Sequence, residues 1–178
     1  IGIPQPIDRI CKSAITREKT LIGSTQIEID FCNSLIDQGF SCIPQKAIGP
    51  YNIDIFINVP KIAVEIFGGG WHNSSKHLAR FRPRIEYLFD CGITPIIIWN
   101  TANWPLGSNA IKYIITLSQE LSSRPSFRRE EHVIGGNGYL ISIGNRKFNC
   151  YPGKRLTYYR DIATGRFNSA IWEETSMM

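Results

Sequence analysis

The sequence predicts an α/β protein, with a mixed central sheet flanked by helices and a small, basic, β-rich C-terminal module. Two observations support this. Apolar residues fall alternately into helix-spaced and strand-like patterns along residues 24–121. The charge balance then changes: residues 1–121 carry eleven basic and ten acidic side chains, whereas residues 122–178 carry nine and five. The Ser/Pro stretch at 122–126 is typical of a linker. We therefore expect an N-terminal extension (1–23), a core (24–121) and a basic module (122–178).

The core is predicted to run helix–strand–strand–strand–helix–strand–helix. Its first helix covers residues 25–38, with Ser24 as N-cap and Gly39 as the C-terminal stop. Apolar residues of this helix, Ile27, Phe31, Leu35 and Ile36, recur at helical spacing, and the second helix is interrupted by Pro83. The remaining predicted segments are strands 40–44, 52–58, 62–67 and 94–99 and helices 77–90 and 107–121.

Two acidic residues, Asp54 and Glu65, lie inside strands otherwise made of Ile, Val and Phe. The tight connection at 59–61 predicts an antiparallel hairpin, which would place the two carboxylates opposite one another. Neighbouring carboxylates repel, and a divalent cation removes the repulsion. Mg²⁺ prefers such hard oxygen ligands. The alternative is one exposed face of an edge hairpin.

Two further residues are candidates for chemistry. Glu28 lies at the border of the buried face of its helix and is directed toward the sheet; many ordinary helices have such a border glutamate. Three glycines at 68–70 precede Trp71 and His72, so the turn can return His72 toward the strand that bears Glu65. A histidine there could act as a general base, or the segment is a flexible loop with an incidental histidine.

The C-terminal module contains a segment, 146–160, with five basic residues and no acidic one. Four aromatic residues are interleaved with the basic ones, which suits phosphate neutralisation combined with base stacking. The sequence at 135–143 predicts a hairpin in the same module. The alternative is a β-appendage that packs on the core or on a second subunit of a homodimer. The basic residues are Arg146, Lys147, Lys154, Arg155 and Arg160.

Composition narrows the class of protein further. The net charge is +5, which permits a nucleic-acid partner without requiring one. No apolar run approaches the ~18–20 residues of a membrane helix, so no membrane partner is expected. The five cysteines form no Cys-x-x-Cys pair, which favours reduced thiols over a disulfide scaffold or a classical zinc finger. We expect a cytoplasmic protein from a prokaryote or a phage.

Taken in order, Glu28, the segment 51–54 (Tyr-Asn-Ile-Asp) and the segment 63–72 (Ala-Val-Glu-Ile-Phe-Gly-Gly-Gly-Trp-His) resemble a known family. They are similar to the very-short-patch repair endonuclease-like branch of the PD-(D/E)XK nucleases, which includes homing endonucleases with a Glu-Asp-x-His-Asp motif. The spacings of 26 and 18 residues look the same as in the repair enzymes. The stretch 80–100 resembles their helix, glycine and final apolar strand. The resemblance covers residues 24–121 and implies a restriction-endonuclease-like core that cleaves double-stranded DNA.

The resemblance also implies roles for individual residues. Asp54 and Glu65 would hold Mg²⁺, for which Mn²⁺ would substitute; in an ungapped alignment the second ligand is the Ile66 carbonyl instead. His72 would be the base or proton shuttle, and Glu28 a water-mediated outer ligand of the metal. Gln45, on the preceding strand, is within reach of such a site. Two arginines one turn apart suit phosphate contacts, or belong to an ordinary solvated helix face: Arg80 and Arg84.

The sequence departs from the family pattern at two positions. The aspartate expected to orient the histidine is Phe81, and the lysine of the Glu-x-Lys motif is Phe67. These departures favour the alternative of a non-catalytic DNA-binding module that retains the nuclease fold. Among enzymes, a homing endonuclease is favoured over a mismatch-repair nicking endonuclease, because the sequence lacks the zinc-ligand set in which the repair enzymes resemble one another.

Overall fold

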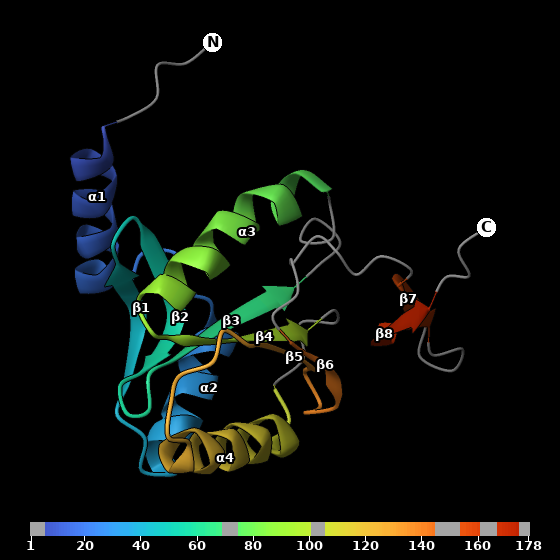
Figure 1. Cartoon of the computed structure of the whole chain (residues 1–178). Coiled ribbons are helices and arrows are strands. Elements are labelled where there is room, and N and C mark those ends of the chain that lie inside the picture. Colours follow the sequence, from blue (N-terminus) through green and yellow to red (C-terminus); the bar gives the residue numbers. More distant parts are fainter. Residues whose placement is uncertain (1–5, 69–74, 101–105, 145–153, 161–166, 175–178) are drawn as a thin grey trace.

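The computed structural model describes residues 6–68, 75–100, 106–144, 154–160 and 167–174 (Figure 1). Residues 75–79, 141–142, 144 and the last two segments are described by their backbone alone. The elements are α1 (Ile7–Thr20), α2 (Gln26–Asp37), β1 (Cys42–Ile48), β2 (Tyr51–Ile57), β3 (Ile62–Gly68), α3 (Ser75–Asp90), β4 (Thr94–Asn100), α4 (Ser108–Ser123), β5 (Glu131–Gly135), β6 (Leu140–Gly144), β7 (Lys154–Arg160) and β8 (Phe167–Glu174).

The sheet confirms the predicted α/β class and the order of the seven core elements. Six strands lie in the order β1-β2-β3-β4-β5-β6. The pairs β1–β2, β2–β3 and β5–β6 are antiparallel, and β3–β4 and β4–β5 are parallel, so the sheet is mixed. Both predicted hairpins, β2–β3 and β5–β6, are present. Strands β7 and β8 form a second, two-stranded antiparallel sheet.

Strands β5 and β6 fall in the part of the sequence assigned to the basic module. In the structure they extend the core sheet, with β5 lying parallel to β4. The sheet therefore continues past the Ser/Pro stretch, and the change in charge along the sequence does not mark its end.

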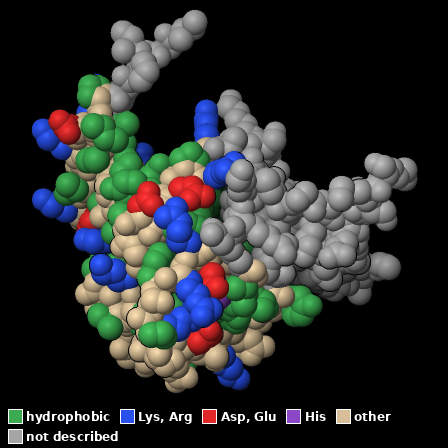
Figure 2. Space-filling view, in the orientation of Figure 1, with side chains coloured by type: hydrophobic (Ala, Val, Ile, Leu, Met, Phe, Trp, Pro, Cys, Tyr) green, Lys and Arg blue, Asp and Glu red, His purple; other side chains and the backbone are tan. Residues whose placement is uncertain are grey.

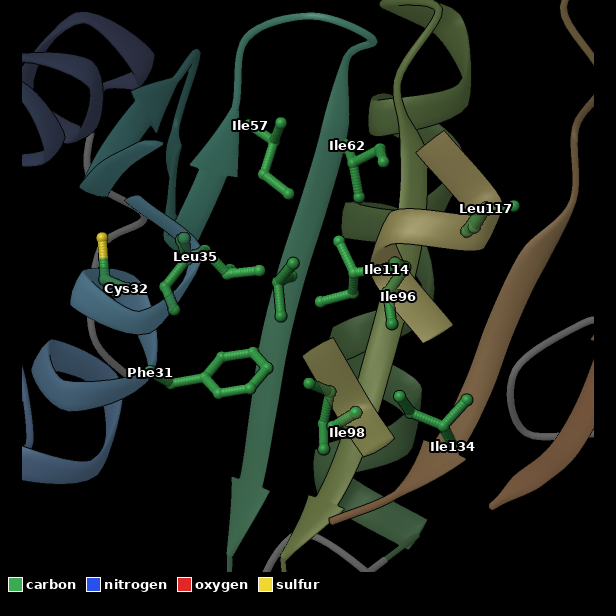
Figure 3. Close-up of a cluster of buried hydrophobic side chains, with 13 residues drawn as sticks. Phe31, Cys32, Leu35, Ile57, Ile62, Ile96, Ile98, Ile114, Leu117 and Ile134 are labelled. Atoms are coloured by element: carbon green, nitrogen blue, oxygen red, sulfur yellow. The ribbon is translucent and has the colours of Figure 1, made fainter. Parts of the chain in front are cut away.

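Helices cover both faces of the sheet. Helices α2 and α4 pack on one face, where Phe31 and Leu35 meet Ile114 and the isoleucines of the strands (Figure 3). Helix α3 covers the other face through Phe81, Ile85, Leu88 and Phe89, and this second cluster also contains Ala63 and Phe67 of β3. Every residue of β4 is buried, as expected for a central parallel strand with both faces covered.

Three local features differ from the sequence predictions. The N-cap of α2 is Thr25 rather than Ser24, because Thr25 and Glu28 form a reciprocal capping box. Helix α3 continues through Pro83 instead of being interrupted there. Proline removes one helical hydrogen bond, and here the burial of Ile85 and the following apolar residues against the sheet compensates for that loss. Helix α1 was not predicted.

The only histidine whose side chain the structure describes, His132, gives a prediction for acid stability. It is 1% exposed on β5, and its Nδ1 lies 2.8 Å from the Tyr113 hydroxyl. Burial lowers the pKa of His132 from 6.5 to about 4, because the interior disfavours the charged ring. The unfolded chain thus binds a proton at a higher pH than the folded protein does.

The free energy of unfolding should therefore fall as the pH is lowered from about 6.5 to about 4, by about 3 kcal/mol from this residue. Urea denaturation at a series of pH values measures the effect. His132→Gln keeps a hydrogen-bonding group for Tyr113 but cannot titrate, so the variant should show a flatter profile than the wild type in this range. Parallel profiles would contradict the assignment.

Candidate functional site

The β2–β3 hairpin brings Asp54 and Glu65 together on the face covered by α3. Ile55 pairs with Val64, so the next step in this register sets Asp54 against Glu65. The Ile66 amide donates a hydrogen bond of 2.8 Å to Asp54 Oδ2. On β3, Ala63 and Phe67 lie two positions before and after Glu65, and both belong to the core cluster beneath α3. Because side chains alternate along a strand, Glu65 points to the same face.

Glu65 is a buried carboxylate with a cationic partner. Its side chain is almost fully enclosed and forms an ion pair with Arg84 of α3. Burial raises the pKa of Glu65 well above its usual value; Arg84 opposes this rise, whereas the negative charges of Asp54 and Glu28 add to it. Arg84 also donates to the Asn52 carbonyl. The guanidinium thus supplies the positive charge that this group of carboxylates requires.

Asp54 is half-buried, so it is more accessible to solvent than Glu65 is. Burial raises its pKa, while the charge of Arg84, the Ile66 N–H and a hydrogen bond with Gln45 lower it. One oxygen, Oδ2, accepts the Ile66 amide and so fixes the carboxylate against β3.

Glu28 joins the site through the N-terminus of α2. Its Oε2 accepts hydrogen bonds from the Thr25 amide and from Gln45 Nε2, both 3.2 Å long. The capping box explains why the sequence places the glutamate here, three residues after a threonine. Burial, together with the charge of Asp54, raises the pKa of Glu28. The sequence prediction that Glu28 points toward the sheet is confirmed.

Gln45 connects Glu28 to Asp54 from the middle of β1. It is buried and has a φ of 49°, in the left-handed region that a non-glycine residue rarely adopts. Its carbonyl accepts a hydrogen bond of 2.9 Å from the Asn52 side chain. Strained residues of this kind cluster at functional sites, at a cost of ~1–3 kcal/mol each.

A cavity of about 500 Å³ opens beside these residues. Asp54 and Gln45 line it, so one of the carboxylates faces the space that a ligand would enter. Two arginines, Arg17 and Arg84, contribute to the same wall. The remaining lining residues are Ile22, Gly23, Pro50, Tyr51 and Asn52.

The donor chemistry suits a hard divalent cation. Asp54 and Glu65 supply carboxylate oxygens on one face. Burial is the main cause of their raised pKa values, and a bound cation would favour the charged form of both groups. Within the described ranges, no group of three or more His, Cys, Asp or Glu side chains is arranged to hold a metal. Mg²⁺ does not require one, because it is usually bound by one or two carboxylates together with water and substrate phosphate.

Several residues predicted for the site are not brought to it by the described parts of the chain. His72, Arg146 and Lys147 lie outside the described residues. Lys154 and Arg155 lie on β7, whose backbone alone is described. Arg80 is exposed on α3.

The two positions at which the sequence departs from the nuclease motif that it resembles are core residues. Phe67 and Phe81 are both buried, and their rings meet edge-to-face with centroids 4.7 Å apart. They hold α3 against β3 by aromatic packing.

Sequence reasoning missed two features of the site. It assigned Arg84 to a phosphate contact or to a solvated helix face and did not pair it with Glu65, although a buried glutamate signals the need for a cation. It also assigned no role to Arg17, whose segment carries no motif.

Comparisons of the chain with protein-family models, with curated proteins and with solved structures find no match. None of the helices that the structure describes has the length and apolar character that crossing a bilayer requires.

Proposed function

We propose that the protein is a metal-dependent DNA endonuclease of the very-short-patch-like homing type, with a restriction-endonuclease-like core. The observation that supports this most directly is the pair Asp54 and Glu65, which share one face of a central hairpin beside a cavity. Glu28 reaches the same place from a helix on another part of the chain. Arg84 is the one described cation that pairs with these three carboxylates, so the group keeps an excess of negative charge that a further, divalent cation would offset.

In this proposal Asp54 and Glu65 would hold Mg²⁺, which would supply positive charge against the extra negative charge of the phosphorane-like transition state. Glu28, fixed by Thr25 and Gln45, orients water at the edge of the site. His72 accepts the proton of the attacking water as general base. The water oxygen forms a new bond to phosphorus, and the bond to the leaving sugar oxygen breaks; that oxygen keeps the electron pair and takes a proton from solvent water.

Incubation of supercoiled plasmid with the protein tests the proposal. Mg²⁺ or Mn²⁺ should yield nicked or linear DNA, and EDTA should prevent it. Intact plasmid with both metals, over substrates of varied sequence, would contradict catalysis.

The DNA surface is proposed to include the basic segment 146–160. Part of the basic surface of the described core is already paired, since acidic side chains lie beside basic ones at the centre of the face shown in Figure 2. Arg129, for example, pairs with Glu86 and Asp90, and Arg124 pairs with Glu120.

Neutralising four residues of this segment together should weaken binding to any DNA duplex. Each lost phosphate contact reduces the slope of log K against log salt by ~0.9, so the salt dependence should flatten. Fluorescence anisotropy with a labelled duplex at several salt concentrations measures both effects. An unchanged slope would show that the segment packs on the core or on a second subunit. This variant combines four substitutions: Arg146→Gln, Lys147→Gln, Lys154→Gln and Arg155→Gln.

A non-catalytic DNA-binding module is the second candidate. It is favoured by Phe67 and Phe81, since both occupy motif positions with buried aromatic rings that offer no acid, base or charge. The plasmid assay separates the two: this candidate predicts metal-independent DNA binding without cleavage.

A further inference from the structure

Helix α1 is fixed to the sheet beside the cavity by polar contacts. Glu18 forms an ion pair of 2.8 Å with Lys46 and accepts a hydrogen bond of 2.9 Å from the Ala47 amide. The Asn52 side chain donates to the Ala14 carbonyl over 2.8 Å. These contacts attach α1 to β1 and to β2, the strand that bears Asp54 (Figure 1).

The anchors determine where Arg17 lies. Ala14 is buried, and positions three and four residues further along a helix lie on the same face. Those positions are Arg17 and Glu18, so the face that contacts the sheet also carries Arg17. Arg17 lines the cavity together with Asp54 and Arg84.

Arg17 and Arg84 differ in what they contact. Arg84 is committed to Glu65 and to the Asn52 carbonyl. Arg17 is exposed and makes no ion pair with any other residue that the structure describes. A guanidinium at the mouth of a cavity with its hydrogen-bond donors uncommitted suits a ligand with anionic oxygens.

The carboxylate in the same cavity narrows the choice of ligand. Asp54 would repel a simple anion, but an anion with several oxygens can place one against a cation held by Asp54 and another against an arginine. A phosphodiester has two such oxygens. The cavity volume of about 500 Å³ falls within the usual range of ligand sites.

We propose that Arg17 binds the phosphodiester backbone of DNA in this cavity, so that α1 forms part of the substrate site. The proposal deepens the proposed function and rests on it for the identity of the ligand. It gives the N-terminal helix a role in positioning the strand at the carboxylates.

The test compares Arg17→Gln with Arg9→Gln in the full chain. Arg9 is an exposed arginine of the same helix that does not line the cavity, so it controls for the loss of one positive charge. Binding of a labelled duplex is measured by anisotropy in Ca²⁺, to avoid cleavage. Arg17→Gln should weaken binding about tenfold, as expected for one lost charge-assisted contact, and Arg9→Gln by less than about twofold.

Two further measurements make the result decisive. Arg17→Lys, which keeps the charge, should recover part of the affinity, and thermal unfolding should show that all variants are folded. Equal effects of Arg17→Gln and Arg9→Gln, or no DNA binding by the wild type, would overturn the proposal. Binding that depends on Arg17 in a protein that never cleaves plasmid would support it while refuting catalysis.

Discussion

Replacing Asp54 with asparagine should abolish Mg²⁺-dependent cleavage, with a rate loss on the order of 10³-fold or more. Metal ions supply several kcal/mol of transition-state stabilisation in such reactions, and each 1.36 kcal/mol changes the rate tenfold. Asparagine is a weak ligand for Mg²⁺, yet its amide oxygen can still accept the Ile66 N–H that Asp54 Oδ2 accepts. The variant should therefore retain the fold and lose the metal. The plasmid assay measures the rate.

The matched control is Asp37→Asn, which changes the same group at an exposed position of α2 away from the cavity. It should cleave at the wild-type rate. Calorimetric titration with Mn²⁺ provides a second readout, in which Asp54→Asn should lose binding and the control should keep it. Cleavage by Asp54→Asn at the wild-type rate would refute the metal assignment.

The strands could be predicted because their patterns are strong. Alternation of Ile53, Ile55 and Ile57 fits a strand, and the short connection to β3 leaves an antiparallel hairpin as the simplest solution. The continuous apolar run of β4 likewise required burial on both faces. The proximity of Asp54 to Glu65 follows from the hairpin, because the register of the two strands determines which residues lie opposite one another.

The packing of helix α1 on the sheet and the contacts of Arg84 could not be predicted in this way. Ile7, Ile10, Cys11 and Ala14 recur at helical spacing, but of the residues of α1 only Ala14 is buried, and polar contacts from β1 and β2 hold the helix in place. Arg84 lies 19 residues after Glu65 on another element, and no local pattern connects them. Both features depend on contacts between segments distant in the sequence, which periodicity does not encode.

Replacing Arg84 with methionine should lower the free energy of unfolding by about 3–5 kcal/mol, the usual cost of removing one partner of a buried ion pair. Glu65 would remain almost fully enclosed without its cation, beside Asp54 and Glu28. Methionine keeps much of the apolar length that packs near Tyr51 and Phe81, so the loss reports on charge rather than on a cavity. Urea denaturation at neutral pH in EDTA measures the change.

The control is Arg80→Met, one turn earlier on the same helix and exposed, which should change stability by no more than about 0.5 kcal/mol. Adding Glu65→Gln to Arg84→Met should recover much of the lost stability, because the uncompensated charge is removed as well. If Arg84 takes the place of a metal in the ligand-free protein, Mn²⁺ should stabilise Arg84→Met more than it stabilises the wild type. Equal stabilisation of both would show that the guanidinium and the metal do not compete for the carboxylates, because removing Arg84 would then leave metal affinity unchanged.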